Sequence, residues 1–226
     1  MFEQPSLPAY RLVRSKRRTL ALVIERDGTL TVRAPLRMAE ARVRHFIEAR
    51  SDWIKRKQAE AAKEAPVPHQ FVEGELFHFL GKTFPLRLVP DPAPALVMDG
   101  DCFRLSRSRQ PDGRALFTAW YRAQARTILT ARLEHFACSQ DVKPARLRIS
   151  SARTRWGSCS RVGTLSFSWR LVMAPPQVVD YVIVHELAHL REMNHSRAFW
   201  ALVEGMLPDY KQRRAWLRKN GHSLHL

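Results

Sequence analysis

The fold and its chemistry are decided by residues 181–200, which read YVIVHELAHLREMNHSRAFW. This stretch contains the pattern His-Glu-x-x-His at His185, Glu186 and His189. A helix turns about 100° per residue, so two histidines four residues apart project from one face and can bind a single metal ion. Glu186 points about a quarter-turn away, where it can reach a water beside the metal and act as a general base. The pattern predicts a metal-dependent hydrolase.

Catalytic zinc usually takes three protein ligands and leaves one position for water, so a third ligand is expected. His195 follows His189 by six residues, which is the ligand spacing of the metzincin pattern. In that pattern a glycine lets the chain leave the helix, and this chain has Glu192 at the matching position. We expect Asn194 to make this exit instead, because asparagine tolerates the left-handed conformation. The predicted ligands are His185, His189 and His195.

The residues before the motif are apolar around the whole helix, as a buried helix requires. They are Val178, Val179, Val182, Ile183 and Val184. Two histidines and a glutamate inside such a helix would be costly without a partner that satisfies them, and a divalent cation is the simplest partner. The alternative is a chance match of the motif, which would leave only a basic globular scaffold.

Three segments resemble the YgjP-like metallohydrolase family: residues 155–159 (RWGSC), residues 180–189 (DYVIVHELAH), and Asn194-His195-Ser196 with Phe199-Trp200. The family is related to the SprT-like proteins and, more distantly, to the zincin metallopeptidases. The resemblance implies an α+β protein with a zincin-like catalytic domain, whose active-site helix carries the HExxH motif. It also implies one zinc ion, or another divalent metal, on His185, His189 and His195, with Glu186 as the catalytic carboxylate. The family is filed with metallopeptidases, while some members are described as metal-dependent UTP pyrophosphatases.

Residues 1–110 are predicted to form a small, largely antiparallel, β-rich N-terminal subdomain with one helix. Hairpins are expected where apolar alternation flanks a turn, such as Asp27-Gly28, and a helix where apolar residues form a helical stripe. The hairpins cover residues 19–35, 75–89 and 96–105, and the helix covers residues 38–63. The prolines within residues 65–69 end that helix and mark the strongest internal break.

Residues 111–226 are predicted to form the zincin-like metallohydrolase domain. Its expected elements are a helix over 114–139, strands over 145–151 and 164–172, the active helix, and two closing helices. Asp180 should face away from the metal and anchor a basic residue, and Ser196 should cap the helix that follows the motif. His222 and His225 are expected in a frayed tail outside the site.

Between the two predicted strands lies the segment Arg153-Thr154-Arg155-Trp156-Gly157-Ser158-Cys159. Gly157 permits close backbone approach, and Arg153 and Arg155 could hold an anionic group beside the metal, since guanidinium pairs with carboxylate or phosphate. By the resemblance, this segment, with Trp156 and Ser158, is the candidate strand that binds extended substrate. The alternative is that the two arginines pair with acidic side chains such as Asp180.

A chain of 226 residues with 45% hydrophobic content can bury one core with a smaller attached subdomain. No apolar run is long enough to cross a bilayer, and the start MFEQPSLP lacks the plan of a signal peptide. We therefore expect a cytoplasmic protein with no membrane partner. Cys102, Cys138 and Cys159 have no paired spacing and are expected to be reduced thiols.

The formal charge is +17, from 38 Lys and Arg residues against 21 Asp and Glu residues. A field of this sign attracts polyanions, including nucleic acid and nucleotide phosphates. The basic residues are scattered without a block of five or six, so a solvated basic surface is an equal alternative.

The leading functional prediction is a zinc-dependent metallopeptidase that acts on a peptide or protein, with a metal-bound water activated by Glu186. One alternative keeps the site and hydrolyses a nucleoside triphosphate such as UTP, although the chain has no glycine-rich phosphate loop. Another is a DNA-associated protease module that binds nucleic acid through its basic surface, although no DNA-binding motif is visible.

Overall fold

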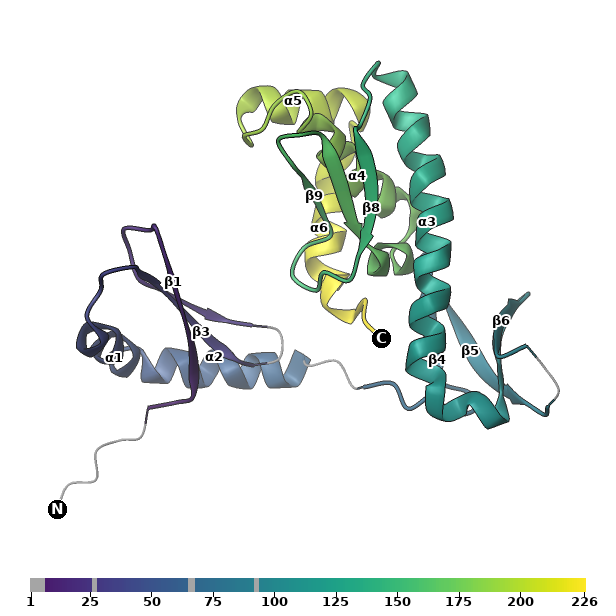
Figure 1. The fold of residues 1–226 in the computed structure, drawn as a ribbon, viewed down its shortest axis with the longest axis horizontal. Coiled ribbons are helices and arrows are strands. Elements are labelled where there is room, and N and C mark those ends of the chain that lie inside the picture. The colour runs from purple at the N-terminus through teal and green to yellow at the C-terminus, as the bar shows by residue number, and fades with distance from the viewer. Residues whose placement is uncertain (1–6, 26–27, 65–67, 92–93) are drawn as a thin grey trace. The chain divides into compact units, whose positions relative to one another are not determined.

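The computed structural model describes residues 7–25, 28–64, 68–91 and 94–226. It is a mixed α+β protein that divides into two compact units, Met1–Val67 and Pro68–Leu226 (Figure 1). The division therefore falls in the proline-containing break, and not at residue 110 as the predicted domains have it. The hairpins after residue 75 belong to the second unit because their apolar side chains join its core. No helix in these described ranges is both long and apolar enough to cross a membrane.

The first unit contains a three-stranded sheet with helices on its apolar face. Its strands are β1 (Tyr10–Ser15), β2 (Ala21–Ile24) and β3 (Leu30–Pro35), in the order β1-β3-β2. β2 and β3 form the predicted antiparallel hairpin, whose turn residue Asp27 lies outside the described residues. β1, a strand that the sequence did not predict, pairs with β3 in parallel.

The single helix predicted over residues 38–63 is two helices. They are α1 (Glu40–Glu48) and α2 (Ser51–Glu64). The amide of Arg50 donates a hydrogen bond to the carbonyl of Ile47, three residues back, at 3.1 Å. This bond closes a tighter turn than the four-residue bond of an α-helix, and α1 ends at Glu48. Both helices still face β3, and together they form one core from Leu30, Val32, Ala34, Val43, Ile47 and Ile54. The apolar stripe thus predicts the buried face correctly but carries no proline or glycine that would signal the break.

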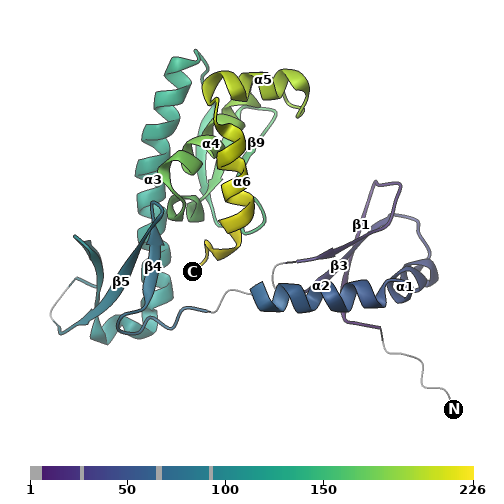
Figure 2. The same ribbon diagram turned by 180° about the vertical axis from the view of Figure 1, so that it is seen from behind.

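The second unit begins with a four-stranded sheet that packs beside one end of a long helix, α3 (Figure 2). The strands are β4 (Leu76–Phe79), β5 (Lys82–Val89), β6 (Leu96–Asp99) and β7 (Cys102–Ser106), in the order β4-β5-β7-β6. β4-β5 and β6-β7 are the two predicted hairpins, and β5 and β7 join them in parallel. α3 (Gly113–Ser139) follows a short 3-10 turn (Arg107–Asp112) and packs Phe117 on Phe77, with ring centres 4.0 Å apart.

A second sheet in this unit lies against the helix that carries the HExxH motif. Its strands are β8 (Arg146–Ser150), β9 (Gly157–Cys159) and β10 (Thr164–Ser168), in the order β8-β10-β9, so β9 is an edge strand. β10 pairs with β8 in parallel and with β9 antiparallel. The strand predicted over 164–172 is correct only to Ser168, because Trp169–Met173 form a 3-10 helix in which every residue is buried. The apolar alternation continues through Trp169, Arg170 and Leu171, so the sequence pattern does not mark the end of the strand at Ser168.

The HExxH helix, α4 (Pro176–Ala188), contacts α3, β9 and both of the last two helices. Those are α5 (Arg197–Met206) and α6 (Tyr210–Asn220), followed by a short 3-10 turn (Gly221–Ser223). Asp180 of α4 accepts hydrogen bonds from Nε and Nη2 of Arg132 on α3, at 2.6 and 2.5 Å. Nη1 of Arg213 on α6 lies 4.0 Å from the same carboxylate. The prediction that Asp180 anchors a basic residue is confirmed, and its partners hold α4 between α3 and α6.

The C-terminal residues are packed, and the prediction of a frayed tail is wrong. Leu224 and Leu226 are buried, and Arg114 donates a hydrogen bond to the carbonyl of Leu226 at 2.6 Å. Burial, followed by the charge of His69, lowers the pKa of His225 to about 4. Two leucines at alternate positions reach the core and fix the tail, which composition alone does not reveal.

Candidate metal centre

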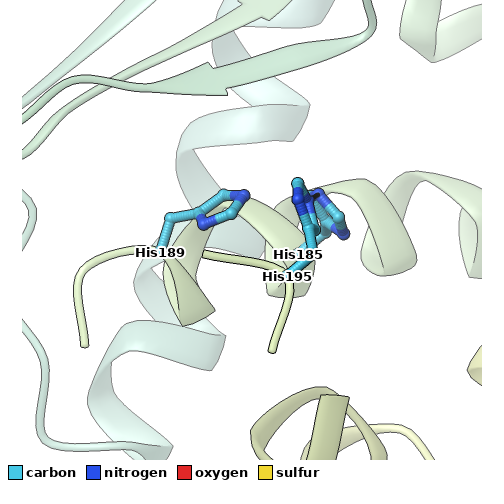
Figure 3. A group of neighbouring side chains, drawn as sticks. All are labelled: His185, His189 and His195. Carbon is cyan, nitrogen blue, oxygen red and sulfur yellow. Dashed lines mark hydrogen bonds between the residues drawn. The ribbon is translucent and has the colours of Figure 1, made fainter. Parts of the chain in front are cut away.

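Three histidine side chains converge at the C-terminal end of α4. His185 and His189 lie one turn apart at the end of the helix, and His195 comes from the loop that leads to α5 (Figure 3). Their ligating nitrogens all lie within 4.8 Å of one another, and the Nε2 atoms of His185 and His195 are 3.1 Å apart. The ring centres are 4.7 to 5.0 Å apart in all three pairs. The structure therefore brings the three predicted ligands together.

Hydrogen bonds and packing set the direction of these rings. Nδ1 of His189 lies 3.0 Å from the carbonyl oxygen of Glu192, to which it can donate, and Nε2 is then left as the acceptor nitrogen. Phe199 of α5 packs on all three rings, with ring centres 4.5 to 4.9 Å apart. Ser196 caps α5, as predicted, by accepting a hydrogen bond from the Phe199 amide at 3.2 Å. The cap fixes the residue after His195 to the start of α5.

The chain leaves α4 without a left-handed residue in this loop. Among the described residues other than glycine, only Phe71, Leu80 and Asp141 have a positive φ. The expectation that Asn194 adopts this conformation is therefore wrong. Instead, the amide of Glu192 bonds to the carbonyl of Ala188 at 2.9 Å, so the last turn continues before the chain bends. Glu192, at the glycine position of the metzincin pattern, then supplies the carbonyl that orients His189.

The residues present fit a bound divalent ion such as zinc. Zinc lies about 2.0–2.1 Å from imidazole nitrogens, so two tetrahedral ligands have nitrogens about 3.3 Å apart, close to the observed 3.1 Å. Burial, followed by the charge of His189, lowers the pKa of His185 to about 3, and burial also lowers the pKa of His195. Both rings are therefore neutral near pH 7, which is the form that binds metal.

Glu186 is enclosed at the start of the last turn of α4. Its side chain is buried, and its Oε2 atom has no hydrogen-bond partner among the described residues. Burial raises the pKa of this carboxyl to about 7, and the charge of Arg155 opposes the shift only in part. A carboxyl group with such a pKa can accept and release a proton near neutral pH.

Gly157 of the edge strand β9 lies directly against this carboxyl group. A methyl group at Gly157 would lie 2.5 Å from Oε1 and 2.6 Å from Cγ of Glu186, well inside the separation of about 3.5 Å at which nonbonded atoms pack. Only glycine fits here, in agreement with the close backbone approach expected from the sequence. The contact brings the edge of the sheet next to the candidate base.

The neighbours of Gly157 point alternately to the two faces of the strand. Cys159 shares the face of Gly157, and burial, followed by the charge of Glu186, raises the pKa of its thiol. Ser158 lies opposite Ser166 of β10 and faces the other way. Trp156 is partly buried against the core. The side chain of Ser158 therefore points away from Glu186, whereas the Trp156 ring lies beside Gly221 at the end of α6. The predicted substrate contacts of both residues stay a prediction.

The two predicted arginines differ in position. Both are exposed, but only the charge of Arg155 acts on Glu186. Neither pairs with Asp180 within the described part of the chain, because Arg132 and Arg213 occupy that carboxylate. The predicted anion-binding role stays a prediction for both arginines, and of the two only Arg155 acts on Glu186.

Two further residues lie beside the centre and were not predicted from sequence. Tyr181 precedes His185 by one helical turn, with ring centres 5.9 Å apart. Arg214 of α6 has its guanidinium carbon 4.9 Å from the centre of the Trp200 ring, which itself lies 5.8 Å from the rings of His185 and His195. The four-residue spacing could have indicated Tyr181. Nothing in the local sequence marks Arg214, because tertiary packing brings α6 to the site.

The ligating nitrogens of three imidazoles converge, and a buried carboxyl group follows one of them in the chain. This arrangement is that of a metal-dependent hydrolase. The family model described as "YgjP-like, metallopeptidase domain" matches residues 18–220. The chain therefore belongs to the YgjP-like family, as the sequence resemblance indicates.

Individual relatives match shorter parts of the chain. The UTP pyrophosphatase of Escherichia coli (strain K12) is 44% identical over 48 residues, which are 20% of this chain and 29% of that protein. The match thus spans less than a third of that relative's length. A solved structure, the metallopeptidase zymogen of Pyrococcus abyssi abylysin, is 24% identical, with a TM-score of 0.37, over 40% of this chain and 93% of that one.

Proposed function

We propose that the protein is a zinc-dependent metallopeptidase with Glu186 as its general base. The observation that supports this most directly is a buried carboxyl oxygen without a hydrogen-bond partner, next in the chain to one of three converging imidazoles. The metallopeptidase description of the family supports the peptide bond as the target.

The three histidines and Glu186 have different roles in the proposed reaction. His185, His189 and His195 would hold one divalent ion, which when bound would act as a Lewis acid and lower the pKa of a water towards 7. Glu186 would accept the proton of the attacking water and deliver it to the leaving nitrogen, a double role that suits its pKa of about 7.

The edge strand β9 is the proposed binding strand for extended substrate. β9 pairs with β10 on one side, and no other described strand pairs with its second edge. An open edge can accept an added strand through main-chain hydrogen bonds. Because Gly157 lies against Glu186, a peptide on this edge would run beside the base.

A matched pair of glutamate variants tests the proposal. Protein purified without chelator should contain about one zinc ion per chain by elemental analysis and should cleave casein. Glu186→Gln should keep the metal and lose about 10²- to 10⁴-fold in turnover, because the proton acceptor is gone. Glu204→Gln, on the exposed side of α5 where Glu204 pairs with Lys211, should change neither property. Full turnover in Glu186→Gln would contradict the mechanism.

A second candidate function is hydrolysis of a nucleoside triphosphate between its α and β phosphates. The match to a protein named UTP pyrophosphatase supports it, as does the exposed Arg155 whose charge reaches Glu186. Separate incubation of the zinc-loaded protein with UTP and with casein distinguishes the two candidates. Release of pyrophosphate without cleavage of casein would favour the nucleotide, and the reverse result would favour the peptidase.

A further inference from the structure

The exposed side of the metal centre is bordered by a stack of side chains from α5 and α6. Trp200 lies 5.8 Å from the rings of both His185 and His195, measured between ring centres. Tyr210 stacks on Trp200 at 5.3 Å with an angle of 17° between the planes, which limits how the indole can turn. The guanidinium carbon of Arg214 lies 4.9 Å from the centre of the same indole. The indole therefore holds a cation next to the two histidines that line the more open side of the site.

Arg214 differs from its neighbour Arg213 in the partners that it has. Arg213 is 16% exposed, and it binds the carboxylate of Asp209 at 2.9 Å and the carbonyl of Gln177 at 2.9 Å. Arg214 is exposed and makes no ion pair within the ranges that the structure describes. Stacking on an indole uses the face of a guanidinium and leaves its in-plane N–H groups free to donate. Arg213 thus has a structural role, and Arg214 keeps its donors.

The charge of Arg214 reaches the centre itself. Its guanidinium lies over the indole of Trp200, whose ring centre is 5.8 Å from those of His185 and His195. Arg155 approaches from the segment before β9, two residues from Gly157, which lies against Glu186. Two cations from different segments therefore border a site in which the carboxyl group of Glu186 is buried.

We propose that Arg214, held by Trp200, forms an anion-binding subsite beside the three histidines and takes a carboxylate or phosphate oxygen of the substrate. The inference rests on the proposed hydrolytic site and adds what its substrate must carry: a negative group one side chain away from the reacting bond. Guanidinium binds both kinds of oxyanion through paired hydrogen bonds, so the chemistry is shared by an acidic peptide and a nucleotide.

A set of single variants tests the subsite by binding, without relying on turnover. The probes are inorganic phosphate and succinate, titrated by calorimetry at low salt into the zinc-loaded full chain. Arg214→Gln should weaken the binding of at least one probe about tenfold, because a charge-assisted hydrogen bond is lost. Arg214→Lys should retain part of the affinity, since it keeps the charge and loses the paired geometry. Zinc content, measured for every variant, separates loss of the anion subsite from loss of metal.

Lys219→Gln is the matched control. It removes one exposed positive charge from the same helix, about 140° around from Arg214, and should leave both affinities unchanged. A larger effect on phosphate than on succinate would assign the subsite to a nucleotide, and the opposite order would assign it to an acidic peptide. Equal affinities of the wild type and Arg214→Gln, or no binding of either probe to the wild type, would overturn the subsite. If the wild type turned over neither casein nor UTP, the proposed function would be wrong, but the measured anion affinity would still support the subsite.

Discussion

The two ends of α4 differ in whether their buried polar groups have hydrogen-bond partners. At the N-terminal end, Asp180 accepts two hydrogen bonds from Arg132 and has Arg213 nearby. At the C-terminal end, Nδ1 of His185 and Oε2 of Glu186 are buried with no partner in the described part of the chain. Buried polar atoms in native proteins nearly always have partners, so the second end is the exception. One helix therefore carries a structural anchor and a reactive site about one and a half turns apart, and the buried atoms without partners distinguish the two.

The largest expected effect comes from removing one histidine at the reactive end. His195→Ala should weaken zinc affinity by at least about a hundredfold, because two imidazoles make a poor site. The melting temperature of the metal-free protein should change little, since His195 is exposed. Competition with a fluorescent zinc chelator measures the affinity. His222→Ala, also exposed and outside the centre, is the control, and equal affinity in both variants would remove His195 from the ligand set.

The opposite pattern is expected at the structural end. Asp180→Asn should lower the free energy of unfolding by about 2–3 kcal/mol, because it leaves Arg132 without a carboxylate and Arg213 with only that of Asp209. Zinc content and turnover per folded molecule should stay the same. Asp209→Asn removes the other, half-exposed carboxylate of Arg213 and should cost less than about 1 kcal/mol. Denaturant unfolding measures the free energy of unfolding of both variants. Equal decreases would show that the buried position of Asp180 does not strengthen its contribution to stability.

A smaller effect is expected where β9 touches the reactive end. Gly157→Ala places a methyl group against Glu186 and should lower turnover about tenfold or more by displacing the carboxyl group. Gly205→Ala on α5 meets no atom within 4 Å and should leave turnover intact, with a slight gain in helix stability. Steady-state cleavage assays compare the two. Wild-type turnover in Gly157→Ala would mean that the strand can move away from the base without consequence.

The smallest expected effect concerns the cap after His195. Ser196→Ala removes the hydrogen bond to the Phe199 amide and should cost about 1 kcal/mol of stability, with a modest loss of zinc affinity as the loop loosens. Ser196→Asp should restore both, because aspartate is also a good cap. Thermal melts with and without zinc report on the two effects. If Ser196→Asp restored the melting temperature but not the zinc affinity, the cap would contribute to stability without contributing to metal binding.

The local parts of this molecule were accessible from sequence. His185, His189 and Ser196 act through helix geometry, and the β2-β3, β4-β5 and β6-β7 hairpins act through alternation and turn residues. In each case the residues that determine the structure lie within about a dozen positions of one another.

The parts that sequence could not give depend on contacts between distant segments. Arg132 and Asp180 are 48 positions apart, and Arg214 reaches the centre only because α6 packs on α4. The parallel pairing of β1 with β3 likewise depends on which edge was free, which alternation does not encode. The 3-10 helix at Trp169–Met173 replaces the end of a predicted strand, and alternation could not reveal it because Arg170 continues the polar face in sequence although it is buried in the structure.

The brevity of β9 has a consequence for selectivity. An unpaired strand edge is a template on which other polypeptides can assemble, and proteins limit that hazard by keeping such edges short. At three residues, β9 offers only a few main-chain groups, too few to recruit copies of the same molecule into a growing ladder. The same shortness means that a peptide backbone alone would be held weakly there. Discrimination among substrates must then come from side-chain contacts on either side of the cleaved bond.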